Sequence, residues 1–223
     1  TRYATQAEAI RASGLVEGER ITHHGEDART PRFLLDGRVV YFAGDNRSLA
    51  ALRTLDARTG AGVETLVPLS GIGAAAPHPD GRQLVYSALD THRDLYAFND
   101  LFVLDLGTEE STRLTDGARA QEPDVSPDGR RLAYTINSAG TTHLAVAELA
   151  DVSGTQRVLV RSARFEQIYS PRFAPDGRTI AYSSWSAGGY RDIRLVDLAS
   201  GRVTGVTRDR AYDSGPTWSA DGR

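Results

Sequence analysis

The sequence predicts an all-β protein that is assembled from repeated units of four antiparallel strands. Three observations lead to this prediction: a recurring tripeptide, aromatic residues at a fixed distance after it, and short strand-like segments between its copies. A regular repeat of this kind indicates that each unit is one supersecondary structure that packs against its neighbours.

The tripeptide Asp-Gly-Arg defines the repeat. Its five copies are separated by 44, 48, 48 and 45 residues and begin at Asp36, Asp80, Asp128, Asp176 and Asp221. In the copy Ser-Pro-Asp-Gly, proline presets φ at the second turn position, and glycine takes the positive φ that closes a hairpin between the first and second strands. Because the Asp residues stand one repeat apart, we interpret the motif as structural, not as paired catalytic carboxylates.

The flanking residues repeat as well. Proline stands five residues before the Asp in four of the five copies, at Pro31, Pro123, Pro171 and Pro216. An aromatic residue, which we expect in the core between units, follows six residues after each of the first four, at Phe42, Tyr86, Tyr134 and Tyr182. Alternating or apolar segments then predict third strands at 52–56, 101–106, 144–149 and 193–198. Fourth strands are expected at 63–67, 112–115, 157–160 and 202–207.

Four strands per unit with aromatics at fixed offsets are the signature of a β-propeller blade. The segments 126–134 (Ser-Pro-Asp-Gly-Arg-Arg-Leu-Ala-Tyr) and 174–182 (Ala-Pro-Asp-Gly-Arg-Thr-Ile-Ala-Tyr) resemble the WD40-like Pro-Asp-Gly repeat of TolB-type six-bladed propellers. The resemblance covers residues 19–223. It implies a bacterial protein of the periplasm or cell envelope. Related blades occur in prolyl oligopeptidase and dipeptidyl peptidase enzymes and in bacterial proteins with a zinc-peptidase-like domain.

The sequence also predicts where the propeller begins and stops. Residues 1–18 include a short Ala-rich helix over 3–11, which we interpret as a linker or as the last helix of an upstream domain. Residues 19–223 are then expected to form an orphan fourth strand, four whole blades, and from Pro216 the first strand of a fifth. The incomplete last unit and the absence of Met indicate a propeller truncated at its C-terminus and taken from a longer protein.

Composition excludes several classes of function. The 26 basic and 29 acidic residues are interspersed and give a net charge of -3, which argues against a nucleic-acid partner. The sequence has no Cys, and therefore no disulfide framework or thiolate zinc site. No segment approaches the roughly 18 consecutive apolar residues of a membrane helix, so we expect no direct membrane insertion.

Motifs that carry chemistry are absent from the sequence. It contains no Gly-x-Ser-x-Gly elbow, no phosphate loop and no His-Glu-x-x-His helix, so we predict no catalytic, cofactor-binding or metal-binding residues. His23 and His24 are adjacent on an extended segment and point to opposite sides, which favours an exposed pair over a metal site. His92 and His143 are expected in loops between second and third strands, and no His has an acidic partner at a telling spacing.

Candidate partner-binding residues lie in the loops that join fourth to first strands and second to third strands. Both sets of loops emerge on the same face, at the mouth of the central channel, where a rigid scaffold commonly carries function. Arg and aromatic residues are enriched in interface hot spots, although the same residues are also ordinary in solvated loops. Three charged residues follow directly after the proline that we expect to open an innermost strand. The candidates are Arg32, Asp124, Arg172, Tyr169, Tyr212, Phe98, Trp185 and Tyr190.

Two functions fit the sequence. The leading hypothesis is a non-catalytic propeller that binds a protein or peptide on its channel-mouth face and needs no cofactor. The alternative is an accessory domain that gates substrates for a peptidase whose catalytic domain lies outside this chain. A sugar-active enzyme is a minor option, because it would need a converging pair of carboxylates and the loop acids are scattered along the sequence.

Overall fold

A computed structural model describes residues 21–22, 27–44 and 49–223 of the chain. These residues form sixteen strands in four sheets, and each sheet holds four antiparallel strands that neighbour one another in sequence order. The strands are β1 (Asp27–Phe33), β2 (Arg38–Gly44), β3 (Ala51–Asp56), β4 (Glu64–Pro68), β5 (Ala75–Pro77), β6 (Gln83–His92), β7 (Tyr96–Asp105), β8 (Ser111–Arg113), β9 (Ala120–Val125), β10 (Arg131–Ser138), β11 (Thr141–Glu148), β12 (Arg157–Val160), β13 (Gln167–Phe173), β14 (Thr179–Trp185), β15 (Arg191–Asp197) and β16 (Val203–Gly205).

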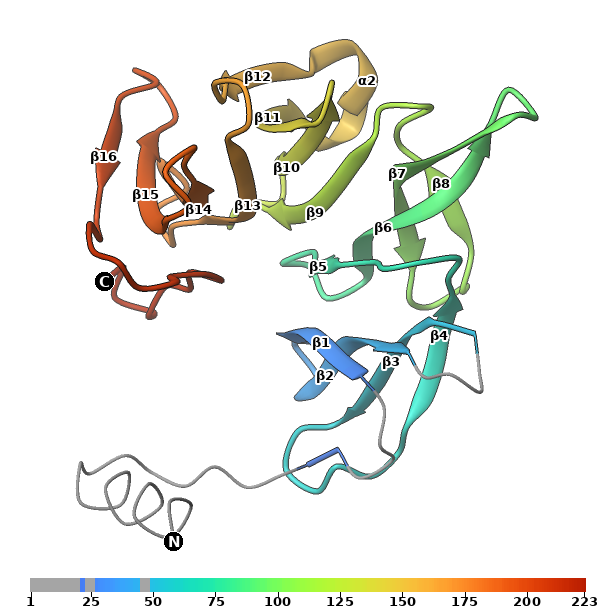
Figure 1. The fold of residues 1–223 in the computed structure, drawn as a ribbon. Coiled ribbons are helices and arrows are strands. Elements are labelled where there is room, and N and C mark those ends of the chain that lie inside the picture. Colours follow the sequence, from blue (N-terminus) through green and yellow to red (C-terminus); the bar gives the residue numbers. More distant parts are fainter. Residues whose placement is uncertain (1–20, 23–26, 45–48) are drawn as a thin grey trace, which may run out of the picture.

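The four sheets are the blades of a β-propeller. We number them 1 to 4 in chain order, so that their first strands are β1, β5, β9 and β13. The blades follow one another around an arc, and the first strand of each lies on the inner side of that arc (Figure 1). This arrangement confirms the predicted fold class and the four whole blades. The expected helix at 3–11 and the segment 1–18 lie outside the described residues.

The Asp-Gly turns have the predicted backbone conformation. Gly37, Gly81, Gly129, Gly177 and Gly222 all have positive φ, between 66° and 86°. In each of the first four turns the Asp carboxylate also accepts a hydrogen bond from the backbone N–H of the Arg two residues later, as Asp80 does from Arg82 at 2.7 Å. The Asp side chain therefore closes its own turn, which confirms that the motif is structural.

The inner strands contain a bulge that the sequence analysis did not anticipate. Pro31, Pro123 and Pro171 lie inside β1, β9 and β13, each of which begins three or four residues earlier, so these prolines do not open their strands. The ladder register shifts at each site. The preceding residues, Thr30 and Ser170 among them, have φ near 50°. Proline has no N–H to donate to a ladder, and a bulge is where a strand can accept it.

The hydrophobic core lies between neighbouring blades. One buried cluster joins blades 1 and 2 around Phe42 and Tyr86, a second joins blades 2 and 3 around Tyr134, and a third joins blades 3 and 4 around Tyr182. All four aromatic residues are at least 96% buried, which confirms the prediction that they are core residues. Each blade therefore needs its neighbour to remove its apolar face from water.

Two hairpins differ from the sequence prediction. The hairpin of β6 and β7 is ten residues long on each side, so its third strand starts five residues before the predicted 101–106, and both His92 and Phe98 belong to strands. His143 lies buried in β11, not in a loop. Between β11 and β12 the chain forms a short helix, α2 (Val152–Thr155), which the repeat pattern did not predict.

The fifth repeat forms its turn but not its strand. Gly222 donates to the carbonyl of Ser219 as in the other turns, yet no strand forms from Pro216 onward. In each of the four blades the first strand pairs with the second strand, which follows Asp-Gly-Arg. After Pro216 no such second strand is present in this sequence, so the segment lacks a pairing partner. Instead, the Trp218 indole N–H donates to the Arg172 carbonyl at 3.1 Å, so this segment packs against blade 4.

Candidate functional site

The candidate residues separate into three places in the structure. Arg32, Asp124 and Arg172 lie on the inner strands β1, β9 and β13. Together with Glu122 on β9 they form what we call the channel cluster. A second group consists of Tyr169, Trp185 and Tyr212 around the Arg191 side chain, and we call it the arginine cage. Phe98 lies apart from both groups, on β7 of blade 2, and Tyr190 is a half-exposed residue directly before β15.

Asp124 connects three blades. Its Oδ1 accepts a hydrogen bond from Arg32 Nη2 at 2.9 Å, and its Oδ2 accepts one from the backbone N–H of Phe173 at 2.7 Å. The ion pair spans blades 1 and 3, and blade 2 carries the small Ala76 at the equivalent inner position. The two side chains are 19% and 14% exposed. Burial raises the pKa of Asp124, and the charges of Arg32 and Arg172 oppose this shift.

Arg172 is partly buried and has no direct carboxylate partner among the described residues. Its Nη1 donates to the carbonyl of Pro171 at 2.5 Å, and among the described residues no carboxylate oxygen lies at ion-pair distance from its guanidinium. Burial, with a further contribution from the Arg32 charge, lowers the pKa of Arg172 to about 10. The guanidinium is therefore still charged at neutral pH, but it has lost water without gaining an ion pair.

Glu122 belongs to the same cluster, although the candidate set did not include it. Its Oε2 accepts a hydrogen bond from the backbone N–H of Ser170 at 2.7 Å, which ties β9 to β13. Burial raises the pKa of Glu122, and this shift is opposed by the hydrogen bond from Ser170 and by the charges of Arg172 and Arg191. The sequence offered one signal, since Glu122 precedes a repeat proline just as Thr30 and Ser170 do.

We expect Glu122→Gln to change how stability depends on pH. A carboxyl group whose pKa is raised by folding stabilises the native state below its ordinary pKa of 4.5, and this contribution is lost as pH rises through the raised value. Glutamine does not titrate. The variant should therefore gain stability relative to the wild type as pH rises from about 4 to 8.

Thermal melting of both proteins across this pH range measures the difference. Glu166→Gln is the matched control, since Glu166 is a half-exposed loop residue that also accepts one backbone hydrogen bond, from the Ala163 N–H. A constant difference in melting temperature between wild type and Glu122→Gln would contradict a Glu122 carboxyl group whose pKa is raised by burial.

The arginine cage is built from segments that are distant in sequence. The Arg191 guanidinium carbon lies 4.2 Å from the ring centroid of Tyr212, 4.4 Å from that of Tyr169 and 5.6 Å from that of Trp185. Contacts of this kind between a guanidinium and an aromatic face are attractive. The structure thus brings three of the predicted residues together, and it adds Arg191, which local sequence gave no reason to select.

Phe98 takes part in a separate aromatic group in blade 2. Its ring stacks on Tyr96 with the centroids 5.9 Å apart, lies 5.9 Å from the His92 ring, and is covered by Arg119 at 4.3 Å. This group belongs to the long hairpin of β6 and β7. The predicted partner-binding residues therefore do not form one continuous surface.

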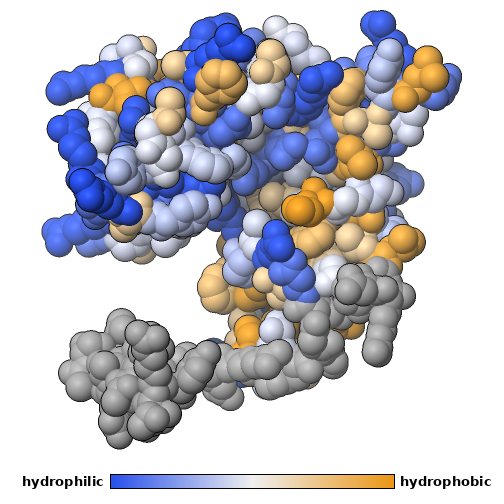
Figure 2. Space-filling model, viewed as in Figure 1, coloured by the Kyte–Doolittle hydropathy of each residue, from blue (hydrophilic) through white to orange (hydrophobic). Residues whose placement is uncertain are grey.

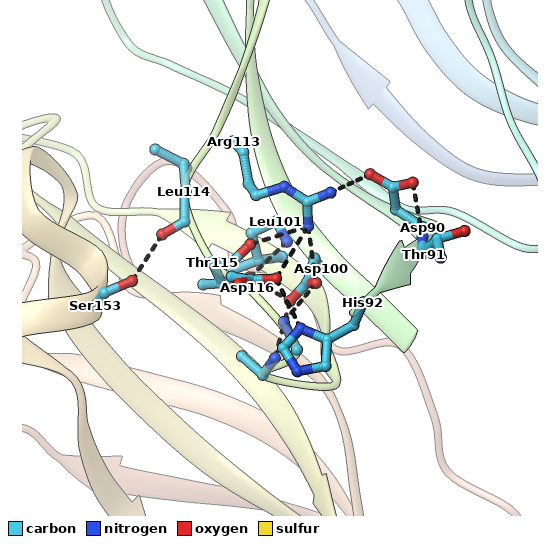
Figure 3. Close-up of polar contacts among 12 residues, drawn as sticks. Asp90, Thr91, His92, Asp100, Leu101, Arg113, Leu114, Thr115, Asp116 and Ser153 are labelled. Atoms are coloured by element: carbon cyan, nitrogen blue, oxygen red, sulfur yellow. Dashed lines mark hydrogen bonds and ion pairs between the residues drawn. The ribbon is translucent and has the colours of Figure 1, made fainter. Parts of the chain in front are cut away.

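His92 has an acidic partner, contrary to the expectation from the sequence. Its Nδ1 lies 2.8 Å from Asp116 Oδ1, and His78 Nδ1 likewise lies 2.9 Å from Asp80. Figure 3 shows that His92 and Asp116 adjoin an ion-pair network centred on Arg113 and the fully buried Asp100. Asp116 follows His92 by 24 residues, so only the folding of blade 2 brings them together.

The described residues contain no arrangement suited to metal chemistry. No three His, Asp or Glu side chains among them are placed to hold a metal ion. The His23-His24 pair lies outside the described residues. Within the same part of the chain, no helix has the length and apolar character needed to cross a bilayer.

The fold and the inner charged strands define the protein as a β-propeller. Residues 119–223 match the family model of the TolB beta propeller domain, which covers blades 3 and 4 and the fifth turn. This part of the chain is therefore similar to that family, and the described residues share the β-propeller fold of TolB structures. The structure describes four blades, so a ring of six stays a prediction. No curated protein sequence matches the chain significantly.

Solved structures show the same fold at low sequence identity. TolB from Acinetobacter baumannii is 20% identical with a TM-score of 0.75, and the match covers 93% of this chain and 50% of that one. A putative TolB from Agrobacterium tumefaciens is 20% identical with a TM-score of 0.71, covering 87% and 72%. A prolyl endopeptidase structure is 15% identical with a TM-score of 0.56, covering 85% of this chain and 29% of that one. The chain thus spans half the length of the Acinetobacter TolB.

Proposed function

We propose that this chain is a non-catalytic propeller module that binds a protein or peptide at the mouth of its channel. The observation that carries the proposal is the arginine cage beside the channel cluster. Tyr169, Trp185 and Tyr212 surround one cation there, and the partly buried Glu122 lies close enough for the charges of Arg172 and Arg191 to act on it. Aromatic and Arg side chains on a rigid scaffold are the residues that dominate the energy of protein interfaces.

The exposure of the aromatic residues supports a binding role. Tyr212 is 68% exposed, and Trp185 and Tyr190 are each about half exposed, so large apolar rings remain available to a partner on blade 4. Figure 2 shows hydrophilic side chains over much of blades 3 and 4 and more hydrophobic ones over blades 1 and 2. A few anchoring aromatics within a polar surface are typical of specific interfaces.

The TolB-type repeats support a location in the periplasm or cell envelope of a bacterium. The absence of catalytic motifs from this sequence is compatible with a recognition role. The partner is therefore expected among envelope proteins or their extended peptide segments.

The second candidate function is a gating domain for a peptidase. The fold similarity to a prolyl endopeptidase structure favours it, because this chain corresponds to less than a third of that protein. The parent sequence discriminates between the two functions. A His-Glu-x-x-His segment before residue 1, or a Gly-x-Ser-x-Gly elbow after residue 223, would favour the peptidase.

Peptide binding by the full chain tests the proposed function. On an array of immobilised decapeptides, Tyr212→Ala should weaken binding of the peptides that the wild type retains by about 1–2 kcal/mol, or about tenfold. Leu35→Ala is the matched control, because Leu35 is equally exposed but lies beside the Asp-Gly turn of blade 1, at the opposite end of the strands. Retention of no decapeptide, or equal affinities of both variants, would contradict the proposal.

A further inference from the structure

Three arginines have guanidinium donors without a partner or without a carboxylate partner: Arg32 on β1, Arg172 on β13 and, outside the inner strands, Arg191 on β15. Arg172 makes one hydrogen bond, to the Pro171 carbonyl. The Nε atoms of Arg32 and Arg191 are buried and have no hydrogen-bond partner among the described residues. A guanidinium offers five N–H donors and no acceptor, and unpaired buried donors are costly. The cluster is therefore suited to a ligand that brings acceptor oxygens and negative charge.

The two carboxylates of the channel cluster are already engaged. Both oxygens of Asp124 accept hydrogen bonds, from Arg32 and from the Phe173 N–H. The Oε2 of Glu122 accepts from the Ser170 N–H. Neither carboxylate contacts the Arg172 guanidinium directly, although the charges of both act on it. Within the channel cluster, Arg172 therefore has no direct ion pair with either acid.

We propose that Arg172 is the anchor for a carboxylate of the bound peptide, either a Glu or Asp side chain or a free C-terminus. This inference rests on the proposed function and specifies its ligand chemistry. Arg172 occupies the inner strand of blade 4, the blade that also holds Arg191, Trp185 and Tyr169 (Figure 1). A peptide on the arginine cage could therefore place an acidic group at Arg172.

The chemistry of the two channel arginines distinguishes their roles. A guanidinium binds a carboxylate through two parallel N–H donors, and desolvation strengthens the pair. Arg32 already donates one hydrogen bond, from Nη2, to Asp124 and therefore serves as a structural cation. Arg172 has the same charge and a position facing the same channel, but it has no carboxylate partner of its own among the described residues.

Fluorescence polarisation with defined peptides tests the assignment. The probe is a fluorescein-labelled octapeptide, Gly-Leu-Tyr-Glu-Leu-Tyr-Glu-Leu, in three forms: with a free C-terminus, with a C-terminal amide, and with the amide and both Glu replaced by Gln. Wild-type chain should bind at least one carboxylate form about ten- to thirtyfold more tightly than the uncharged form. The comparison of the first two forms shows whether a C-terminus or a side chain supplies the carboxylate.

Variants at Arg172 locate the effect. Arg172→Gln should abolish the preference for the carboxylate forms, whereas Arg172→Lys should keep part of it because charge remains without the two-donor geometry. Arg202→Gln, an exposed arginine of blade 4, is the control and should bind like the wild type. Melting temperature of each variant is measured in parallel, so that affinities refer to folded protein.

Three outcomes would overturn the anchor. If the wild type binds all three peptides with equal affinity, a carboxylate is not the recognised group, but the proposed peptide-binding function still holds. If Arg172→Gln still prefers the carboxylate peptides, Arg172 is not the residue that binds the carboxylate. Failure of every form to bind, together with no retention on the decapeptide array, removes both the anchor and the proposed function.

Discussion

Replacing Asp124 by alanine should lower the free energy of unfolding by about 3–5 kcal/mol. The substitution leaves the Arg32 guanidinium without its partner at 2.9 Å and leaves the Phe173 N–H without its acceptor. A buried charge that loses its counterion keeps its desolvation cost and gains nothing in return. Denaturation of wild type and Asp124→Ala in guanidinium chloride measures the difference from the midpoint and slope.

The double variant Asp124→Ala/Arg32→Leu distinguishes the contribution of the ion pair from that of the surrounding contacts. Removing both charges relieves the unpaired cation, so the double variant should be more stable than Asp124→Ala alone. Asp27→Ala is the control, because its ion pair with Arg29 is half exposed and should contribute no measurable stability. If Asp124→Ala and Asp27→Ala denatured at the same guanidinium concentration, Asp124 would not connect the blades as described.

Replacing Asp100 by alanine should cost a similar amount, about 3–5 kcal/mol. The Asp100 carboxylate is fully buried and accepts four hydrogen bonds, from Arg113 Nη1 at 3.0 Å, Thr115 Oγ1 at 2.8 Å, and two backbone N–H groups (Figure 3). The two backbone donors are Gly117 and Ala118, in the loop that leads from blade 2 to blade 3. The variant leaves all four donors without this acceptor.

Asp116→Ala provides the matched control for Asp100. Asp116 is 68% exposed and contacts the same network through His92 and, at 3.9 Å, through Arg113 Nη1, so its removal takes away an acid but no buried acceptor. We expect Asp116→Ala to unfold at nearly the same denaturant concentration as the wild type. Hydrogen exchange adds a local readout, because the Gly117 and Ala118 amides should lose protection in Asp100→Ala. Unchanged protection of these amides would contradict the role of Asp100.

The Asp124 result also bears on the channel. Asp124 binds Arg32 and thereby fixes one of the two arginines that face the channel, so Arg172 is left as the cation available to a ligand. A large stability loss in Asp124→Ala and a small one in Arg172→Gln would separate a structural pair from a binding residue, although both residues directly follow a repeat proline.

Local sequence determined the blades. The turn requires a glycine at positive φ, Gly129, and an Asp side chain that closes it, Asp128. The two residues are adjacent in the chain, so the repeat could be predicted without tertiary information. The aromatic residue six positions after each Asp is equally local, because alternation along a strand fixes which face it occupies. The regular spacing of the internal repeat therefore predicted the four blades and the core position of Tyr134.

Only the tertiary structure decided the site. Asp124 pairs with Arg32 across 92 residues, and the cage around Arg191 draws on β13, β14 and the segment after β16. Such contacts depend on the angle between blades and on the small Ala76 that lets Arg32 reach across. A repeat pattern assigns equivalent places to Arg32 and Arg172. It carries no information on which of them meets a carboxylate, because Asp124 of blade 3 pairs with Arg32 of blade 1 and not with Arg172 of the neighbouring blade 4.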